Sequence, residues 1–373
     1  ALPLAAPRPM AQIHVSADGA LLALSSSGEL WQFGSPWRQL GSGLDPQTPL
    51  ASGHGRIVGR SIDGGLWLLE GGRQQLSSGL ELAPHAGLLV LALGVIAVAG
   101  HARQHVVRLE PGSGGRWVET ARSRDAVLPD ARPLQFDPQG RQSDDNGHVA
   151  VLASPDSERY RHAVLGDGVE ATSVLYLERH SLSLLARLDL PAPHVLEDIA
   201  PRPIAWRGGR ALLTMRAGPL GGQLAVITAT GERLTLAALG EPIGTRHRWL
   251  SATTDGSRLL AVHTPHIGGV LTRYRDDGTR LLGETLGRGV SNHVLGRREL
   301  DISAWIGALL VLPSQDRRQL QVWSADVVAG ASAAQALTLP APVAALRRWT
   351  RDGQAGVAAL LDDGSLAWAA VPG

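Results

Sequence analysis

The fold of this chain is decided by a stretch near its start, Ala20-Leu21-Leu22-Ala23-Leu24 followed by a polar turn and Gly28-Glu29-Leu30-Trp31. An apolar run, a turn and a second apolar run of this size are typical of a β-hairpin. Similar pairs of runs start near residues 20, 56, 94, 148, 210, 258, 308 and 356. Because this spacing is close to the ~40 to 50 residues of propeller repeats, we expect each copy to be one blade.

The turns between the runs favour antiparallel hairpins. Asp-Gly pairs, which suit the positive φ angles of tight turns, recur at Asp18-Gly19, Asp63-Gly64, Asp255-Gly256, Asp277-Gly278, Asp352-Gly353 and Asp363-Gly364. A series of hairpins leaves open edges unless it closes radially. We therefore predict an all-β fold, a β-propeller of about eight blades, or seven if the weak units near residues 94 and 148 share one blade. Two β-sandwiches are the main alternative, but neither a composition shift nor a long linker divides the chain.

Four of the ten tryptophans fall at one position of the second run of the repeat, namely Trp31, Trp67, Trp323 and Trp368. A large aromatic side chain at a repeated position favours packing between neighbouring blades over a ligand-stacking role.

Composition limits the classes of function. The 45 Gly and 23 Pro, against 18% charged residues, favour turns over helices. No Cys is present, which excludes disulfides and Cys-based zinc sites. The 35 basic residues, all Arg, are balanced by 34 acidic ones, so nothing indicates a nucleic-acid partner. No apolar run reaches the ~18 residues of a membrane-spanning helix, and we expect no membrane insertion.

The chain divides into two unequal parts. Residues 1–9 are rich in Ala and Pro and are interpreted as an N-terminal leader or tail of the kind that a processed export signal leaves. Residues 10–373 are expected to form a single propeller domain. This interpretation predicts a periplasmic or extracellular location.

Polar segments between residues 159 and 323 carry a resemblance to a known family. They are Arg159-Tyr160-Arg161-His162, Leu165-Gly166-Asp167 with Glu170, His194-Val195-Leu196-Glu197-Asp198-Ile199-Ala200-Pro201-Arg202, Ile243-Gly244, Arg248-Trp249-Leu250, His263-Thr264-Pro265-His266-Ile267-Gly268-Gly269, Ser291-Asn292-His293, Gly296 and Arg298-Glu299-Leu300. This part of the chain resembles the FG-GAP or VCBS-repeat proteins, bacterial relatives of the integrin-type propeller. The resemblance implies the propeller fold.

The family also implies calcium loops of the form Asp-x-Asp-x-Asp-Gly, whose carboxylates hold the ion. The equivalent loops, at residues 206–210, 253–257 and 305–308, contain one Asp or none. Too few oxygen ligands remain for calcium, so we predict neither a metal nor a cofactor. The best remaining acidic loop, Asp144-Asp145-Asn146-Gly147, is interpreted as a solvated turn.

The chemistry-capable residues are expected to meet on one face of the ring. In a four-stranded blade, the loop that enters the first strand and the loop that joins the second to the third emerge on the same face, and loops held by a rigid scaffold commonly form binding sites. The candidate binding residues on this rim are Tyr160, Arg161, His162, Asp167, Glu170, His194, Glu197, Asp198, Arg246, Arg248, Trp249, His263, His266, Asn292, His293, Arg298 and Glu299.

The favoured function is a non-enzymatic, exported docking module for a protein partner or an envelope polymer. No nucleophile elbow, metalloprotease motif or phosphate-binding loop occurs, so we predict no catalytic residue. For Glu197 and Asp198 we favour hydrogen bonding to loop amides over acid–base chemistry.

Two alternatives remain open. The first is a lyase or hydrolase acting on a polyanionic substrate at the rim of the central channel, in which Arg161, Arg248 and Arg298 bind the anion and His293 or Glu197 transfers the proton. The second is a metal site built from histidines such as His263 and His266, which are three residues apart.

Overall fold

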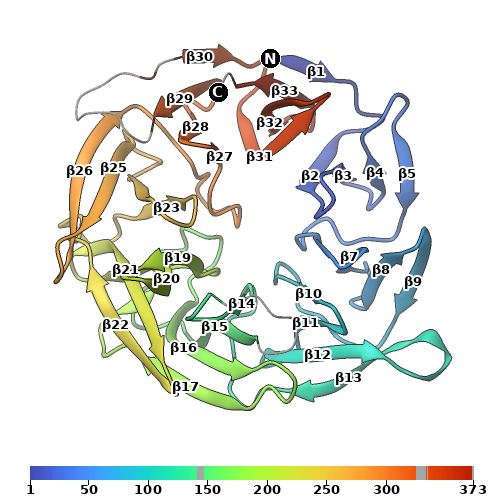
Figure 1. Cartoon of the computed structure of the whole chain (residues 1–373), viewed down its shortest axis with the longest axis horizontal. Helices are drawn as coiled ribbons and strands as arrows, with labels where there is room; N and C mark the ends of the chain where they lie inside the picture. The colour runs from blue at the N-terminus through green and yellow to red at the C-terminus, as the bar shows by residue number, and fades with distance from the viewer. Residues whose placement is uncertain (141–146, 325–332, 334, 372–373) are drawn as a thin grey trace.

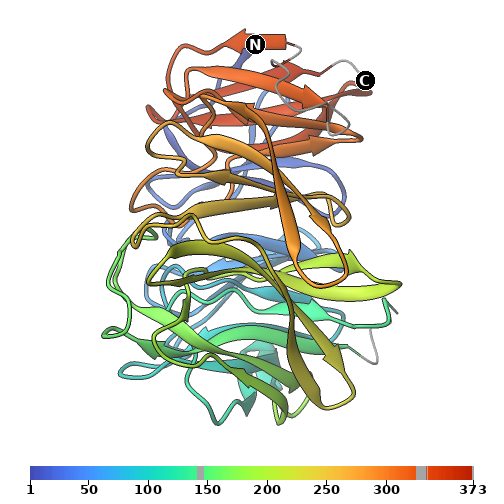
Figure 2. The ribbon, with the colours of Figure 1, turned by 90° about the vertical axis from the view of Figure 1, so that its left-hand side faces the viewer.

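The computed structural model describes residues 1–140, 147–324, 333 and 335–371, so Asp144, Asp145 and Asn146 lie outside the described residues. These residues form a ring of β-sheets around a central channel (Figure 1). The strands of each sheet run across the thickness of the ring, and loops project from its two faces (Figure 2). The described helical structure is limited to one turn, η1 (Ser113–Gly115). No helix in the described part is long and apolar enough to cross a membrane.

The ring consists of eight four-stranded antiparallel blades, each ordered from the channel outward. Blade 1 contains β2 (Met10–Val15), β3 (Leu21–Ser25), β4 (Leu30–Gln32) and β5 (Arg38–Gly41), and blade 2 contains β6 (Ala51–Gly53), β7 (Arg56–Arg60), β8 (Leu66–Glu70) and β9 (Arg73–Ser77). Blade 3 contains β10 (Leu89–Leu91), β11 (Gly94–Ala99), β12 (His105–Pro111) and β13 (Trp117–Arg122), and blade 4 contains β14 (Leu134–Phe136), β15 (His148–Asp156), β16 (Glu170–Glu178) and β17 (Leu184–Asp189).

The remaining blades follow in the same order. Blade 5 contains β19 (Arg202–Trp206), β20 (Gly209–Gly218), β21 (Gly221–Thr230) and β22 (Arg233–Leu239), and blade 6 contains β23 (Leu250–Thr254), β24 (Leu259–His263), β25 (Val270–Asp276) and β26 (Leu281–Arg288). Blade 7 contains β27 (Ala304–Ile306), β28 (Leu309–Pro313), β29 (Gln319–Ser324) and β30 (Gln335–Thr338), and blade 8 contains β31 (Val343–Arg351), β32 (Gln354–Leu361), β33 (Leu366–Ala370) and β1 (Leu2–Leu4).

The predicted repeat is confirmed. Each of its eight starts falls at or within three residues of a second strand, from β3 in blade 1 to β32 in blade 8. These strands lie between two neighbours and read as continuous apolar runs, because both faces are covered; all six residues of β11 are buried. The weak units near residues 94 and 148 are two separate blades, so the count is eight. The Asp-Gly corners turn as expected, for example with φ of 85° at Gly64.

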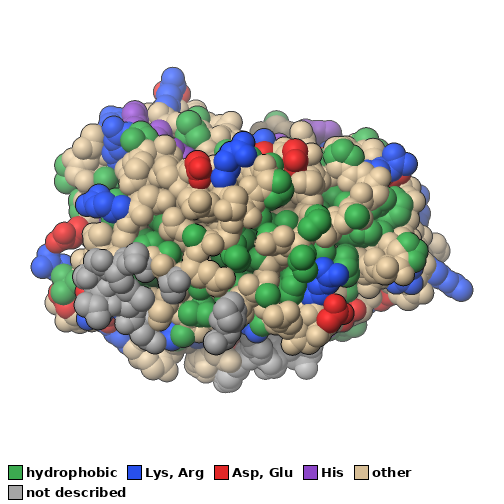
Figure 3. All heavy atoms as spheres, turned by 90° about the horizontal axis from the view of Figure 1, so that it is seen from above, with side chains coloured by type: hydrophobic (Ala, Val, Ile, Leu, Met, Phe, Trp, Pro, Cys, Tyr) green, Lys and Arg blue, Asp and Glu red, His purple; other side chains and the backbone are tan. Residues whose placement is uncertain are grey.

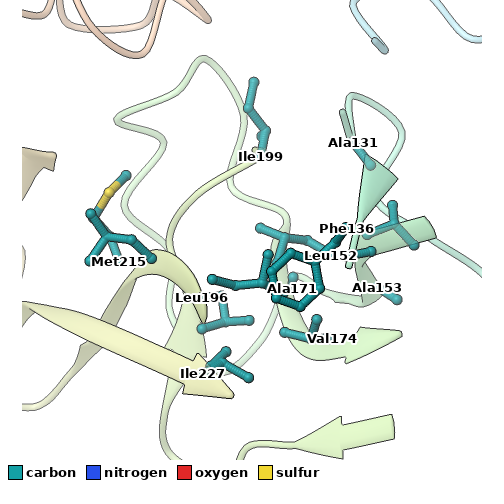
Figure 4. Packing of buried hydrophobic residues seen from close by; sticks show 14 of the residues in the cluster. Ala131, Phe136, Leu152, Ala153, Ala171, Val174, Leu196, Ile199, Met215 and Ile227 are labelled. Atoms are coloured by element: carbon teal, nitrogen blue, oxygen red, sulfur yellow. The ribbon is translucent and has the colours of Figure 1, made fainter. Parts of the chain in front are cut away.

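Blades 4 and 5 are joined by an additional strand, β18 (Val195–Leu196). It pairs with β16 through Leu196 and with β20 through both of its residues, so the two blades share one nine-stranded sheet. Apolar side chains from both blades pack together around this junction, among them Leu152, Val174, Leu196 and Ile227 (Figure 4).

The ring is closed by β1, which pairs with β33. Leu4 of β1 is buried and packs in one cluster with residues of blades 8 and 1. The sequence predicts that residues 1–9 lie outside the propeller, whereas Leu2–Leu4 supply the outermost strand of blade 8. The strand gives no signal in the sequence because it is three residues long and contains Pro3, which is tolerated at a sheet edge.

The repeated tryptophans lie on the third strands β4, β8, β29 and β33. Two of them contact the outer strand of the preceding blade at a glycine. A Cβ added to Gly41 would come within 2.6 Å of the Trp67 ring, and one added to Gly287 within 2.2 Å of the Trp323 ring. Trp67 is fully buried, as the predicted packing between blades requires.

We expect Leu4→Ala to destabilise the protein by about 2 to 5 kcal/mol, because it empties a buried position on the closing strand. Urea denaturation followed by tryptophan fluorescence measures this change. The control is Leu2→Ala on the same strand, where the side chain is 55% exposed. Equal stability of the two variants would show that β1 is not needed for closure.

Gly287→Ala is expected to cost about 1 to 3 kcal/mol, since the added methyl group overlaps the Trp323 ring. The matched control is Gly168→Ala, because an added Cβ there meets no atom within 4 Å. Thermal unfolding of both variants compares them, and a wild-type melting temperature for Gly287→Ala would contradict the tight inter-blade contact.

Candidate functional site

Five loops on one face of the ring carry the candidate residues, and we call this face the rim. The loops are 157–169 between β15 and β16, 197–201 between β18 and β19, 240–249 between β22 and β23, 264–269 between β24 and β25, and 289–303 between β26 and β27. As the blade geometry predicts, they either enter a first strand or join a second strand to a third.

Tyr160, His162 and Glu197 meet on the rim together with His247, which the sequence did not single out. The Tyr160 hydroxyl accepts a hydrogen bond from the His247 backbone N–H at 2.8 Å. The His162 ring stacks on the His247 ring with centroids 5.1 Å apart. The guanidinium of Arg246 lies 5.4 Å from the centre of the Tyr160 ring. Loops of blades 4 and 5 are therefore held together by aromatic contacts.

Glu197 is the centre of this group. Its side chain is fully buried, and Oε1 lies 2.5 Å from Nδ1 of His162. Burial raises the pKa of Glu197 well above its usual range, while burial and the charge of Arg248 lower the pKa of His162. Both shifts disfavour the charged forms, so burial weakens the ion-pair character of this contact.

Glu170 is a second buried carboxyl group close to Glu197. Burial and the charge of Glu197 raise the pKa of Glu170 to about 10. Oε2 of Glu197 has no hydrogen-bond partner among the described residues. Burial and mutual repulsion therefore disfavour a state in which both acids are ionised.

Trp249, His266 and His293 continue the contact network toward blade 7. Trp249 donates from Nε1 to the Glu197 carbonyl at 3.0 Å, and its ring lies parallel to that of His266. Nε2 of His293 lies 2.8 Å from the Arg297 carbonyl, which can only accept a hydrogen bond. His293 must therefore carry its proton on Nε2, and its Nδ1 accepts from Nε2 of His266 at 2.8 Å.

Burial holds these imidazoles neutral. It lowers the pKa of His266 to about 4 and that of His293 to about 3. His263 points to a different partner, because its Nε2 lies 2.5 Å from the Tyr274 hydroxyl. Among the described residues, no group of three or more His, Asp or Glu side chains is placed to hold a metal ion.

Several other candidates hold the loops in place. Asp198 accepts hydrogen bonds from the backbone N–H groups of Ile199 and Ala200, at 2.8 and 3.1 Å, and pairs with Arg202. This is the amide-binding role favoured from the sequence. Asn292 donates to Asp301, and the His194 ring covers Gly218.

The charged candidates are spread over the rim. Arg298 bridges Asp130 and Asp167, and Glu299 pairs with Arg347 of blade 8. Arg161 pairs with Glu158 and is exposed, and Arg248 is also exposed. The three arginines of the predicted anion clamp thus have different surroundings, and His293 is only 1% exposed.

A cavity of about 440 Å³ lies at the mouth of the channel on the rim face. It is lined by Arg298 and Glu299, and also by Gln12, Arg132 and Arg347, which the sequence analysis missed. Arg132 precedes the first strand β14, whereas Gln12 and Arg347 lie within the first strands β2 and β31. The rule that located the rim loops, applied to every blade, would have found Arg132 only.

Seen edge-on, the ring shows histidine side chains along one margin, and its outer wall carries scattered charged and apolar side chains (Figure 3).

No protein-family model matches the chain, and no curated protein matches it. Solved structures do. Sqt1 of Saccharomyces cerevisiae has a TM-score of 0.65 at 11% identity, covering 98% of this chain and 96% of that one. The Dos1 propeller gives 0.62 at 11% identity, with 97% and 93% covered, and BamB of Moraxella catarrhalis gives 0.55 at 14%, with 96% and 92% covered. At such identities the likeness shows the fold alone: this chain is a β-propeller over its whole length.

The buried acids predict an unusual pH dependence of stability. Because the pKa of Glu170 is about 10 in the folded protein and near 4.5 when exposed, its stabilising contribution is complete below pH 4.5 and is lost as the pH rises toward 10. The loss is roughly 1.4 kcal/mol for each pH unit in this window. Glu170→Gln, which mimics the neutral acid, is expected to flatten this decline.

Chemical denaturation at about pH 5, 7 and 9 measures the free energy of unfolding near the two ends and in the middle of this pH window. The control is Glu158→Gln, which removes an exposed carboxylate on the same loop. Parallel curves for Glu170→Gln and the wild type would show that Glu170 ionises normally.

Proposed function

We propose that this chain is a non-enzymatic docking module whose rim binds an acidic, partly apolar segment of a protein partner. The proposal is carried by three exposed aliphatic side chains on rim-face loops at blades 5, 6 and 7. Leu220, in the turn between β20 and β21, is 57% exposed, Ile267 is 63% exposed and Leu295 is 62% exposed. Exposed apolar surface of this kind marks sites of protein contact.

The loops that present these side chains are fixed to one another. The Gly244 N–H donates to the Leu220 carbonyl, and the Thr264 N–H donates to the Trp249 carbonyl. The hydrogen bond between His266 and His293 links the loop of Ile267 to that of Leu295. The surface is thus largely formed in advance, which limits the entropy lost on binding.

The charge of this surface favours an acidic partner. Arg297 is exposed on the loop of Leu295, and Arg246 and Arg248 are exposed on the loop between β22 and β23, which is hydrogen-bonded to the loops of Leu220 and Ile267. No salt bridge of these three arginines is found among the described residues. Exposed aliphatic groups beside cations suit a protein segment better than a polysaccharide. The surface is expected to select an acidic segment and to bind it less tightly at high salt.

The enzymatic alternative lacks an assembled site. Arg298 is held by two aspartates, Arg161 by Glu158, and the two ring nitrogens of His293 are engaged by His266 and a backbone carbonyl. Arg298, Arg161 and His293 are therefore already engaged by groups of the protein itself, which argues against their use on a substrate.

We also propose a family relation and a cellular location for this chain. One is a distant relation to the FG-GAP or VCBS-repeat proteins, supported by the quoted segments lying on one face. The other is a periplasmic or extracellular location, for which fractionation of cells producing the full-length gene product is the test.

The test of docking compares a rim variant, Ile267→Asp with Leu295→Asp, with a control variant, Leu76→Asp with Leu93→Asp. The control side chains are 57% and 74% exposed and lie on an outer strand and in the turn between β10 and β11. Partners captured by cross-linking are identified, purified and titrated against each variant. We expect the rim variant to bind at least about tenfold more weakly and the control to bind as the wild type.

Equal binding by the two variants would place the contact elsewhere on the ring. Binding of an envelope polysaccharide that is unaffected by the rim variant would replace the protein-docking proposal by the polymer alternative.

A further inference from the structure

The cavity at the channel mouth adjoins the exposed docking surface, with which it shares Arg297. Its walls come from blades 1 and 8 and from the loops that enter blades 2, 3, 4 and 7. Its volume, about 440 Å³, is in the range of sites for small organic molecules.

Four guanidinium groups line this cavity, and two of them have carboxylate partners. Arg347 donates through both Nη atoms to Glu299, at 3.1 and 2.9 Å. Arg298 donates from Nε to Asp130 at 2.6 Å and also pairs with Asp167. The opposite charges within each of these pairs neutralise each other, and the pairs hold these side chains in place in the cavity wall.

The other two guanidinium groups are not neutralised in this way. Arg132 donates from Nη2 to the backbone carbonyl of Arg298 at 2.5 Å, and its Nε has no partner among the described residues. Arg297 is exposed, and the described structure contains no ion pair of its side chain. Burial lowers the pKa of Arg132, as expected for a cation taken out of water without a full set of acceptors.

Apolar residues also line the cavity. They are Met10, Ile13, Pro49, Val294 and Leu360, and we call them the apolar wall. Gln12, another lining residue, is already engaged, because its amide donates to the carbonyls of Pro46 and Thr48. A ligand in this cavity therefore meets both cationic donors and hydrocarbon.

We propose that the channel mouth binds a small organic acid, with its carboxylate between Arg132 and Arg297 and its hydrocarbon part against the apolar wall. A planar carboxylate matches the paired N–H groups of a guanidinium, and it supplies the acceptors that Arg132 lacks. A fully hydrated inorganic anion would leave the apolar wall unused. This site does not depend on the docking function proposed above.

Calorimetric titration of the full chain tests the proposal with octanoate, benzoate and adipate as probes and with the corresponding amides as neutral controls. We expect at least one acid to bind about tenfold or more tightly than its amide, because a charge-assisted hydrogen bond is lost in the amide. Arg297→Gln and Arg132→Met are each expected to weaken the binding of that acid by about tenfold or more.

Arg297 is exposed and unpaired in the described structure, so its substitution leaves the fold intact, which circular dichroism checks. The matched control is Arg233→Gln on the outer strand β22, where another exposed arginine is removed far from the channel. Its affinity for the acid should equal that of the wild type.

Three results would overturn the proposal: equal binding of acids and amides, binding that Arg297→Gln leaves unchanged, or no binding of any probe. Inorganic phosphate is titrated in parallel. If phosphate binds as tightly as the acids, the apolar wall makes no contribution and the site is a general anion site. The carboxylate could belong to a free small acid or to the C-terminus of a peptide. To separate these two sources, a short peptide with a free C-terminus is compared with its amidated form.

Discussion

Closure of the ring by β1 is the constraint on which the rest of the molecule depends. The central channel and the rim exist only if blade 8 meets blade 1 at the right distance, and β1 supplies the outermost strand of blade 8 before the chain continues into blade 1. Its backbone pairs with residues 366–368, and Leu4 anchors it in the apolar cluster between the blades. The two ends of the chain are thus tied to each other, and neither can fray without opening the ring.

The polar residues of the rim show how burial changes what a side chain can do. In water, Glu197 and His162 would both be charged near pH 6, but here burial shifts the pKa of each toward the neutral form while the two side chains share a hydrogen bond. The imidazoles of His266 and His293 likewise form hydrogen bonds with each other, and His293 also donates to a backbone carbonyl. These groups act as internal connections of the scaffold. In the docking that we propose, recognition falls to the exposed leucine, isoleucine and arginine side chains on the same face.

The sequence predicted the ring well because its signal is repeated. Buried second strands such as β11 must be apolar on both faces, and they recur in all eight blades. Asp-Gly corners such as Asp63-Gly64 must adopt positive φ, and they recur at six turns. The convergence of Tyr160 and Trp249 followed from blade geometry alone. Features that occur once were missed: β1 and β18 have three and two residues, too few for a periodic pattern.

The pKa shifts of the rim residues could not be predicted from the sequence either. Whether Glu170 is a solvated carboxylate or a buried acid depends on how β16, β18 and the loop at residues 157–169 cover it, and no local pattern encodes that cover. The same holds for Arg132, which reads as an ordinary loop arginine until the other walls of the channel mouth are placed around it.

The strand β18 makes the junction between blades 4 and 5 stiffer than the other junctions of the ring. Across the other junctions, backbone pairing between blades in the described structure is limited to isolated bridges, such as Leu44 with Ser61 and Val127 with Ala153. Blades 4 and 5, by contrast, cannot separate without breaking a continuous sheet. A thermal fluctuation that spreads the ring is therefore concentrated at the other junctions, while these two blades move as one plate. Tyr160, His162 and Glu197 lie on the rim loops of these two blades, so their contacts with one another are expected to move least.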